Sequence, residues 1–135
     1  MSSSIVLDNE NGTVWYHDEG GGIVHHHIKK WVWGDALRAL LEAGTKAMRD
    51  HGAKKWLSDD RLNGVLKPAD EEWAKTVWFP KTLQAGWKHW AVVLPEKVVG
   101  QMNMKRFAED YAKAGINASL FSDPEAAQTW LAKLF

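Results

Sequence analysis

A nearly continuous apolar run near the middle of the chain, Trp90-Ala91-Val92-Val93-Leu94, places the strongest constraint on its fold. A strand with one solvent-exposed face alternates apolar and polar residues, whereas a strand covered on both faces is apolar throughout. The run therefore predicts a central strand, within residues 87–94, in a sheet that is covered on both sides.

The first third of the chain predicts an antiparallel β-meander. Residues 5–7, 13–17 and 23–28 are short strand-like segments. The turn-prone segment 8–12 joins the first two, and the glycine-containing loop 18–22 joins the second and third. The next residues lead into a helix.

The clearest helical pattern follows the meander. Its apolar positions recur at intervals of three and four residues, and Asp35 and Gly52 suit its start and end. Gly44 lies on the buried stripe, which indicates close contact with the sheet. The stripe consists of Leu37, Leu40, Leu41, Gly44, Met48 and His51.

Residues 53–58 predict a parallel strand, and a loop over 59–67 follows it. Pro68 suits the first turn of a helix. Because the residue before a proline disfavours helical geometry, Phe79-Pro80 is expected to break this helix. A second short helical piece is predicted over 80–85.

The last third continues the alternation of helices and strands. A helix is predicted from Asn103 to Gly115, a strand over 117–121, and a final helix from the capping signal at 122–125. The order β-β-β-α-β-α-β-α-β-α predicts an α/β fold with a mixed sheet of five or six strands and about four helices. Residues 1–135 are expected to form a single domain.

Composition excludes several classes of function. Lys plus Arg and Asp plus Glu are balanced at 17 each, so we expect no nucleic-acid partner. The chain has no cysteine, which excludes disulfides, thiolate metal sites and cysteine nucleophiles. No apolar run approaches the roughly 20 residues of a membrane span, and no signal-peptide pattern is present at the start. We therefore expect a cytoplasmic protein without a membrane span.

A polar cluster follows the predicted strand at 53–58. Asp59, Asp60 and Arg61 lie where α/β sheets tend to place their sites, and Asp70 opens the next helix. A carboxylate beside an arginine can act as an acid–base pair or bind an anionic group. The alternative is an ion pair that only orders the loop.

Histidines on the meander are candidate metal ligands. If residue 17 pairs with residue 23, then His17, His25 and His27 share one face of the sheet with Trp15. Three imidazoles suit an open zinc or copper site. The alternative is that these histidines are solvated or lie at an interface.

Nine tryptophans are several times the usual share for a chain of this length, and they indicate core packing, a ligand pocket or an interface. Five of them flank the first helix and the region after the acidic loop, where they are expected to line an apolar pocket or a dimer surface. These are Trp31, Trp33, Trp73, Trp78 and Trp87.

Four motifs carry a resemblance to a known family: KKWLSDDR at 54–61, a P-x-D-x-E-W helix start, a W-F-P segment and AGWKHWAVVLP at 85–95. Together they resemble the STAS-like proteins of the SpoIIAA-like fold. The resemblance is densest over 53–95. It implies two kinds of role, phosphorylation-switched partner binding and lipid carriage. The switch members carry a D-S-S/T-G segment, whereas Ser58 here lies within the strand and no such segment follows, so the phospho-switch does not transfer.

The sequence thus favours a non-catalytic binding or regulatory module that binds a small apolar ligand or a protein partner through a tryptophan-rich surface. No cofactor is expected, and a homodimer is possible. The alternative is a metal-binding protein or an enzyme that uses the histidine face or the Asp59-Asp60-Arg61 loop.

Overall fold

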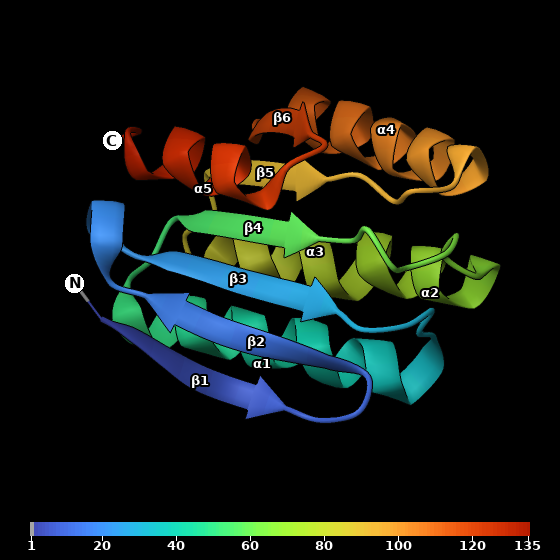
Figure 1. Cartoon of the computed structure of the whole chain (residues 1–135), viewed down its shortest axis with the longest axis horizontal. Coiled ribbons are helices and arrows are strands. Elements are labelled where there is room, and N and C mark those ends of the chain that lie inside the picture. The colour runs from blue at the N-terminus through green and yellow to red at the C-terminus, as the bar shows by residue number, and fades with distance from the viewer. Residues whose placement is uncertain (1) are drawn as a thin grey trace.

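The computed structural model describes residues 2–135, which form one six-stranded sheet in the order β1-β2-β3-β4-β5-β6 (Figure 1). Neighbours in the chain are thus neighbours in the sheet. The strands are β1 (Ser3–Asp8), β2 (Gly12–His17), β3 (Ile23–Ile28), β4 (Lys55–Asp59), β5 (His89–Val93) and β6 (Asn117–Phe121).

The sheet is mixed, as the element order predicts. β1, β2 and β3 pair antiparallel as a meander, and β3 to β6 pair parallel. His17 pairs with Ile23, which confirms the expected register and puts His17, His25 and His27 on one face. The register of β1 shifts between Ile5 and Leu7.

Helices cover the two faces unequally. In Figure 1, α5 (Pro124–Ala132) lies in front of the sheet, and α1 (Gly34–His51) and α3 (Phe79–Gln84) lie behind it. The rear layer also contains α2 (Pro68–Trp73), the π-helical turn η2 (Ala74–Trp78) and α4 (Val98–Lys113). A short 3-10 turn, η1 (Glu19–Gly21), joins β2 to β3. α5 packs on β4, β5 and β6, so the front of β1 and β2 stays open.

Each face of the sheet has its own apolar core because side chains alternate along a strand. On the rear, Trp56 and Trp90 pack among the helices, whereas Leu57 and Ala91 pack against α5 on the front. This arrangement explains the unbroken apolar run in β5, which is covered on both sides. The rear core contains a cluster of touching aromatic rings, Trp56, Trp78, Phe79, Trp87, Trp90, Phe107 and Tyr111.

Gly44 gives α1 its close approach to the sheet, as the sequence predicts. A β-carbon at this position would lie 2.6 Å from Cζ2 of Trp56, so only hydrogen fits against the indole. Gly52 ends α1 with φ at 66°, the left-handed conformation expected there.

The predicted helix break at Phe79-Pro80 does not occur, so this prediction is wrong. α2, η2 and α3 follow one another without interruption from Pro68 to Gln84, with the wider turn of η2 directly before Phe79. Pro80 lacks an N–H and its ring crowds the carbonyl four residues earlier. A π-helical turn relieves this crowding, so the helix absorbs the proline instead of ending.

Several element boundaries also differ from the expectation. β4 extends to Asp59, which the sequence predicts to lie in the loop, and α4 begins at Val98 rather than at the predicted Asn103. The strand β6 has the bounds predicted for it. Asp123 caps α5 by accepting a hydrogen bond from the Glu125 N–H, as the capping signal indicated.

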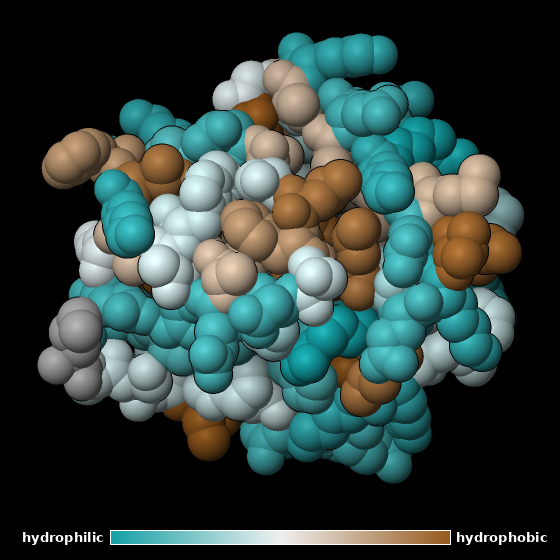
Figure 2. Space-filling view, turned by 45° about the horizontal axis from the view of Figure 1, so that its top comes forward, coloured by the Kyte–Doolittle hydropathy of each residue, from teal (hydrophilic) through white to brown (hydrophobic). Residues whose placement is uncertain are grey.

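Exposed apolar side chains interrupt an otherwise largely hydrophilic surface, as the brown areas in Figure 2 show. Val98, Val99 and Met102 are among them, and all three lie in the first two turns of α4.

Candidate functional site

A small cavity lies on the rear of the sheet, where the carboxyl ends of β3 and β4 meet the helices. It has a volume of about 50 Å³. A single water needs a cavity of roughly 10–15 Å³, so this one has room for a compact group rather than one solvent molecule. Its polar lining comes from His26, Ser58, Asp60 and Asn63.

The walls of the cavity are apolar and mostly aromatic. They are contributed by α1, by the loop after β4, by the α2–η2–α3 run, by β5 and by α4. The apolar lining residues are Leu37, Leu41, Leu66, Ala74, Trp78, Trp90, Met104, Phe107 and Tyr111. Burial raises the pKa of Tyr111, so its hydroxyl keeps its proton.

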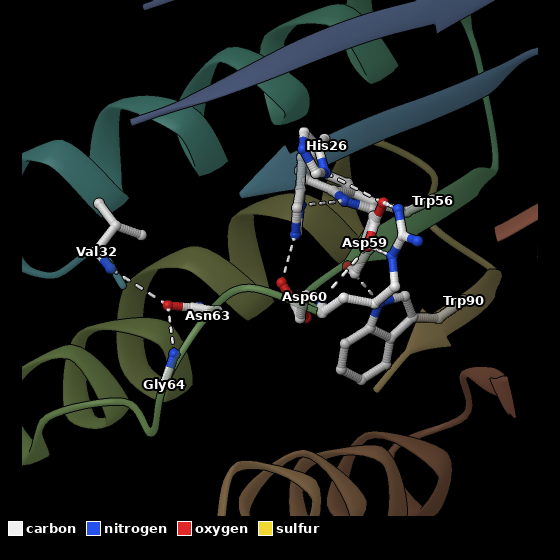
Figure 3. A network of polar contacts seen from close by, with 11 residues as sticks. His26, Val32, Trp56, Asp59, Asp60, Asn63, Gly64 and Trp90 are labelled. Carbon is white, nitrogen blue, oxygen red and sulfur yellow. Dashed lines mark hydrogen bonds and ion pairs between the residues drawn. The ribbon is translucent and has the colours of Figure 1, made fainter. Parts of the chain in front are cut away.

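His26 and Asp60, which both line this cavity, belong to one network of polar contacts (Figure 3). His26 Nε2 lies 2.9 Å from Asp60 Oδ1, and the indole Nε1 of Trp56 donates to His26 Nδ1 at 3.0 Å. An indole can only donate, so Nδ1 accepts and the ring proton sits on Nε2, from which it is donated to Asp60. Both side chains are buried, with 5% and 6% of their surfaces exposed.

Ser58 and the loop after β4 complete the network. The Trp90 indole donates to Ser58 Oγ at 2.8 Å, which ties β5 to β4. Asn63 Oδ1 accepts from the backbone N–H of Val32 at 3.3 Å and of Gly64 at 3.0 Å (Figure 3). The loop that carries Asp60 is therefore fixed to the segment before α1.

Asp59 lies on the opposite side of the sheet from this cavity. Its oxygens accept from Nε and Nη2 of Arg61, both at 2.9 Å, and Oδ2 lies 3.1 Å from Nδ1 of His27. Burial would raise the pKa of Asp59, but the hydrogen bonds and charge of Arg61 outweigh it and the net shift is downward. Asp59 and Arg61 thus form a two-bond ion pair that holds the end of β4.

Asp70 is separate from both groups. It is 2% exposed, and its oxygens accept from the Gly34 N–H at 3.0 and 3.2 Å. Arg38 Nε lies 3.8 Å from Oδ1. Asp70 therefore caps the start of α1 from the first turn of α2, where a negative charge is favourable for both helices. The polar cluster suggested by the sequence thus divides among three locations.

The three candidate metal ligands share a face, and several of their ring nitrogens are engaged by other groups, although Nε2 of His25 is buried with no partner among residues 2–135. His17 Nε2 and His25 Nδ1 are 2.9 Å apart, and Nδ1 of His17 lies 2.6 Å from the hydroxyl of Ser3. Burial lowers the pKa of His25 to about 3, with the neighbouring His17 adding to the shift. Within residues 2–135, no group of three His, Asp or Glu side chains is arranged to hold a metal ion.

The five tryptophans singled out in the sequence do not form one surface. Trp31 and Trp33 are exposed and lie edge to face with centroids 5.3 Å apart, and Lys67 Nζ lies 4.0 Å from the Trp33 centroid. Trp73 is half-buried beneath Arg38. Trp78 and Trp87 are buried in the aromatic cluster, and of the five only Trp78 lines the cavity.

Sequence reasoning missed most of the cavity lining. No role is predicted for His26 from the sequence, although period-two alternation places it on the opposite face from His25 and His27. A histidine facing a core of valine and tryptophan needs a buried partner, which was an available signal. Nothing local to α4 indicates that Met104, Phe107 and Tyr111 line the same cavity as Asp60.

Among the described residues, no helix combines the length and the apolar character that crossing a bilayer would require. No protein-family model matches the chain, and no match was found among the curated proteins or the solved structures.

Proposed function

We propose that this chain is a non-catalytic binding module of the STAS/SpoIIAA-like class, and that it holds a small ligand in the cavity between the sheet and the rear helices. One observation carries the proposal. The cavity combines apolar walls with a few buried polar groups that converge on it, which is the usual construction of a small-molecule site.

The position of the cavity supports this function. It lies beyond the carboxyl ends of parallel strands, where open α/β sheets bind their ligands. Three separate chain segments hold the lining in place through Asn63 and through the Trp90–Ser58 hydrogen bond. A lining fixed before the ligand arrives lowers the ordering cost of binding.

The same hydrogen bonds support a non-catalytic role. His26 Nδ1, the ring atom that could take a proton from a substrate, already accepts the Trp56 N–H. A general base needs a free lone pair within reach of the proton it removes. This histidine therefore serves to hold Asp60 rather than to move protons.

A fragment titration followed by two-dimensional NMR tests the proposal. The indole N–H groups of Trp78 and Trp90 are hydrogen-bonded next to the cavity, to Thr45 Oγ1 and Ser58 Oγ, and so serve as reporters. Trp130, which packs on the front of the sheet with the α5 core, is the internal control. Small apolar fragments should shift the first two signals and leave the third unchanged.

A filled cavity provides the matched control. Ala74→Met places a larger side chain at a lining position, whereas Val77→Met makes a similar change at an exposed position of the same turn. Fragments should raise the Tm of wild type and of Val77→Met but not of Ala74→Met. Equal stabilisation of both variants would show that the fragments bind elsewhere.

Homodimerisation is a second candidate, favoured by the exposed rings of Trp31 and Trp33, which are 46% and 47% accessible. Aromatic side chains of this kind are enriched in interfaces, and a second copy of the chain would cover them. Sedimentation velocity should then show a dimer that dissociates in the double variant Trp31→Ala, Trp33→Ala. A monomer at every protein concentration would rule this candidate out.

A further inference from the structure

We propose that the ligand of the cavity carries a compact cationic group, a protonated amine or a quaternary ammonium, that binds between Asp60 and the surrounding aromatic rings. The inference rests on the proposed binding function and adds the chemical class of the ligand.

The first support is a carboxylate oxygen without a partner. Asp60 is 4% exposed, and its Oδ1 is occupied by His26 Nε2. Its Oδ2 accepts no hydrogen bond from any residue in the described range 2–135, although Asp60 lines the cavity. This oxygen is not among the fully buried atoms that lack a partner, so it stays accessible and can accept a hydrogen bond from a ligand in the cavity.

The second support is the charge balance of the lining. Among residues 2–135, no lysine or arginine lines the cavity, and the nearby Arg61 is bonded to Asp59 on the other face of the sheet. Both ring nitrogens of His26 are already engaged, Nε2 with Asp60 and Nδ1 with the Trp56 N–H, so His26 has no further N–H to offer to a ligand. The missing positive charge would come from the ligand.

The third support is the chemistry of the walls. Trp78, Trp90, Phe107 and Tyr111 all line the cavity, and the Trp90 and Tyr111 centroids are 5.1 Å apart. Aromatic faces attract cations, and clusters of such rings recognise quaternary ammonium groups. Apolar walls also weaken solvent screening, which strengthens the attraction between an ammonium and a carboxylate.

The size of the cavity limits the cation. Its 50 Å³ is about a third of the roughly 150 Å³ that holds a benzene molecule, so it admits a small ammonium group fully and a trimethylammonium head only in part. A longer ligand would need to leave its remaining part outside. We therefore expect affinity to depend on the cationic head.

The test compares choline with 3,3-dimethylbutan-1-ol, which has the same shape but a carbon in place of the charged nitrogen. Each probe is titrated into the full chain, and the indole signals of Trp78 and Trp90 are followed by NMR. Choline should shift both signals and bind at least tenfold more tightly than the alcohol. Methylammonium extends the test to a smaller cation.

Two variants complete the design. Asp60→Asn removes the charge but keeps a carbonyl oxygen that can accept a hydrogen bond from His26. It should lower the affinity for choline at least tenfold. Asp35→Asn removes an exposed carboxylate in the first turn of α1 and should leave the affinity unchanged. A thermal melt of each variant confirms that it is folded.

The outcomes separate the inference from the function it rests on. Equal affinity for choline and the alcohol, or full choline affinity in Asp60→Asn, would overturn the cationic ligand and leave the binding cavity intact. The absence of shifts with both cations also overturns it. If the neutral fragments also cause no shifts of the Trp78 and Trp90 signals, the proposed binding function is wrong.

Discussion

Asp59 and Asp60 are consecutive in the chain but bind histidines on opposite faces of the sheet. Asp59 Oδ2 lies 3.1 Å from His27 Nδ1 on the front, and Asp60 Oδ1 lies 2.9 Å from His26 Nε2 at the rear. The parallel register places His26 and His27 beside the end of β4, so each histidine meets the aspartate on its own side. One carboxylate thus secures the end of the strand, and the other faces the cavity.

Replacing Arg61 with Gln should destabilise the fold because Asp59 would stay buried without its charged partner. We expect a loss on the order of 1–3 kcal/mol at pH 7, measured by urea denaturation. Arg49→Gln, at an exposed site near the end of α1, is the control and should change stability by less than about 0.5 kcal/mol.

The same variant has a defined pH dependence. In the wild type the pKa of folded Asp59 is lowered. The ionised side chain therefore contributes to folding stability above pH 3.8, its ordinary pKa, and this contribution is lost as the pH falls below that value. Without Arg61, burial raises this pKa instead, and protonation relieves the unpaired charge. The difference between wild type and variant should therefore shrink as the pH is lowered toward 4, and a constant difference would contradict this account.

Gly44→Ala should cost about 1–3 kcal/mol because the added methyl group overlaps the buried ring of Trp56. Alanine favours helix over glycine by up to roughly 1 kcal/mol, so a measured loss would reflect the steric overlap alone. The midpoint of chemical unfolding reports the change. A more stable variant would mean that α1 can move away from β4 at little cost.

Val92→Asp should prevent folding, since the side chain at this position is fully buried in β5 and a carboxylate would have no partner there. Val99→Asp makes the same chemical change at a position that is 67% exposed on α4 and should fold normally. Circular dichroism of the two purified variants distinguishes them. A folded Val92→Asp protein would contradict the placement of β5 between two apolar layers.

Acid should weaken the fold through His25. Burial lowers its pKa in the folded state to about 3, below the ordinary 6.5, so the unfolded chain binds more protons between these values. Stability should fall as the pH drops below 6.5, at a rate on the order of 1 kcal/mol per pH unit. Burial also lowers the pKa of His17, which adds to the same window.

The replacement His25→Phe isolates this contribution. Phenylalanine keeps a ring beside Trp15, whose centroid lies 4.7 Å from that of His25, but it cannot bind a proton. Urea unfolding between pH 7 and pH 4 should show a shallower loss of stability in the variant. Identical slopes would mean that His25 can be protonated in the folded state.

Local patterns predicted much of the fold because they reflect short-range chemistry. The apolar run in β5, the stripe around Gly44 and the capping signal at Asp123 each reflect burial or hydrogen bonding near the residue itself. The same local logic failed at Pro80. A proline stops an isolated α-helix, but a π-helical turn within a packed helix can accommodate it.

The sequence by itself determined the order of the elements, the meander register and the presence of an acidic segment after β4. Only the tertiary structure decided that Asp60 meets His26, that Asp70 caps α1 and that Trp78 and Trp90 share a cavity with Phe107. These partners are far apart in the chain, and their contacts depend on how four separate elements pack against one sheet. Periodicity tells which face a side chain occupies, whereas packing decides what that face meets.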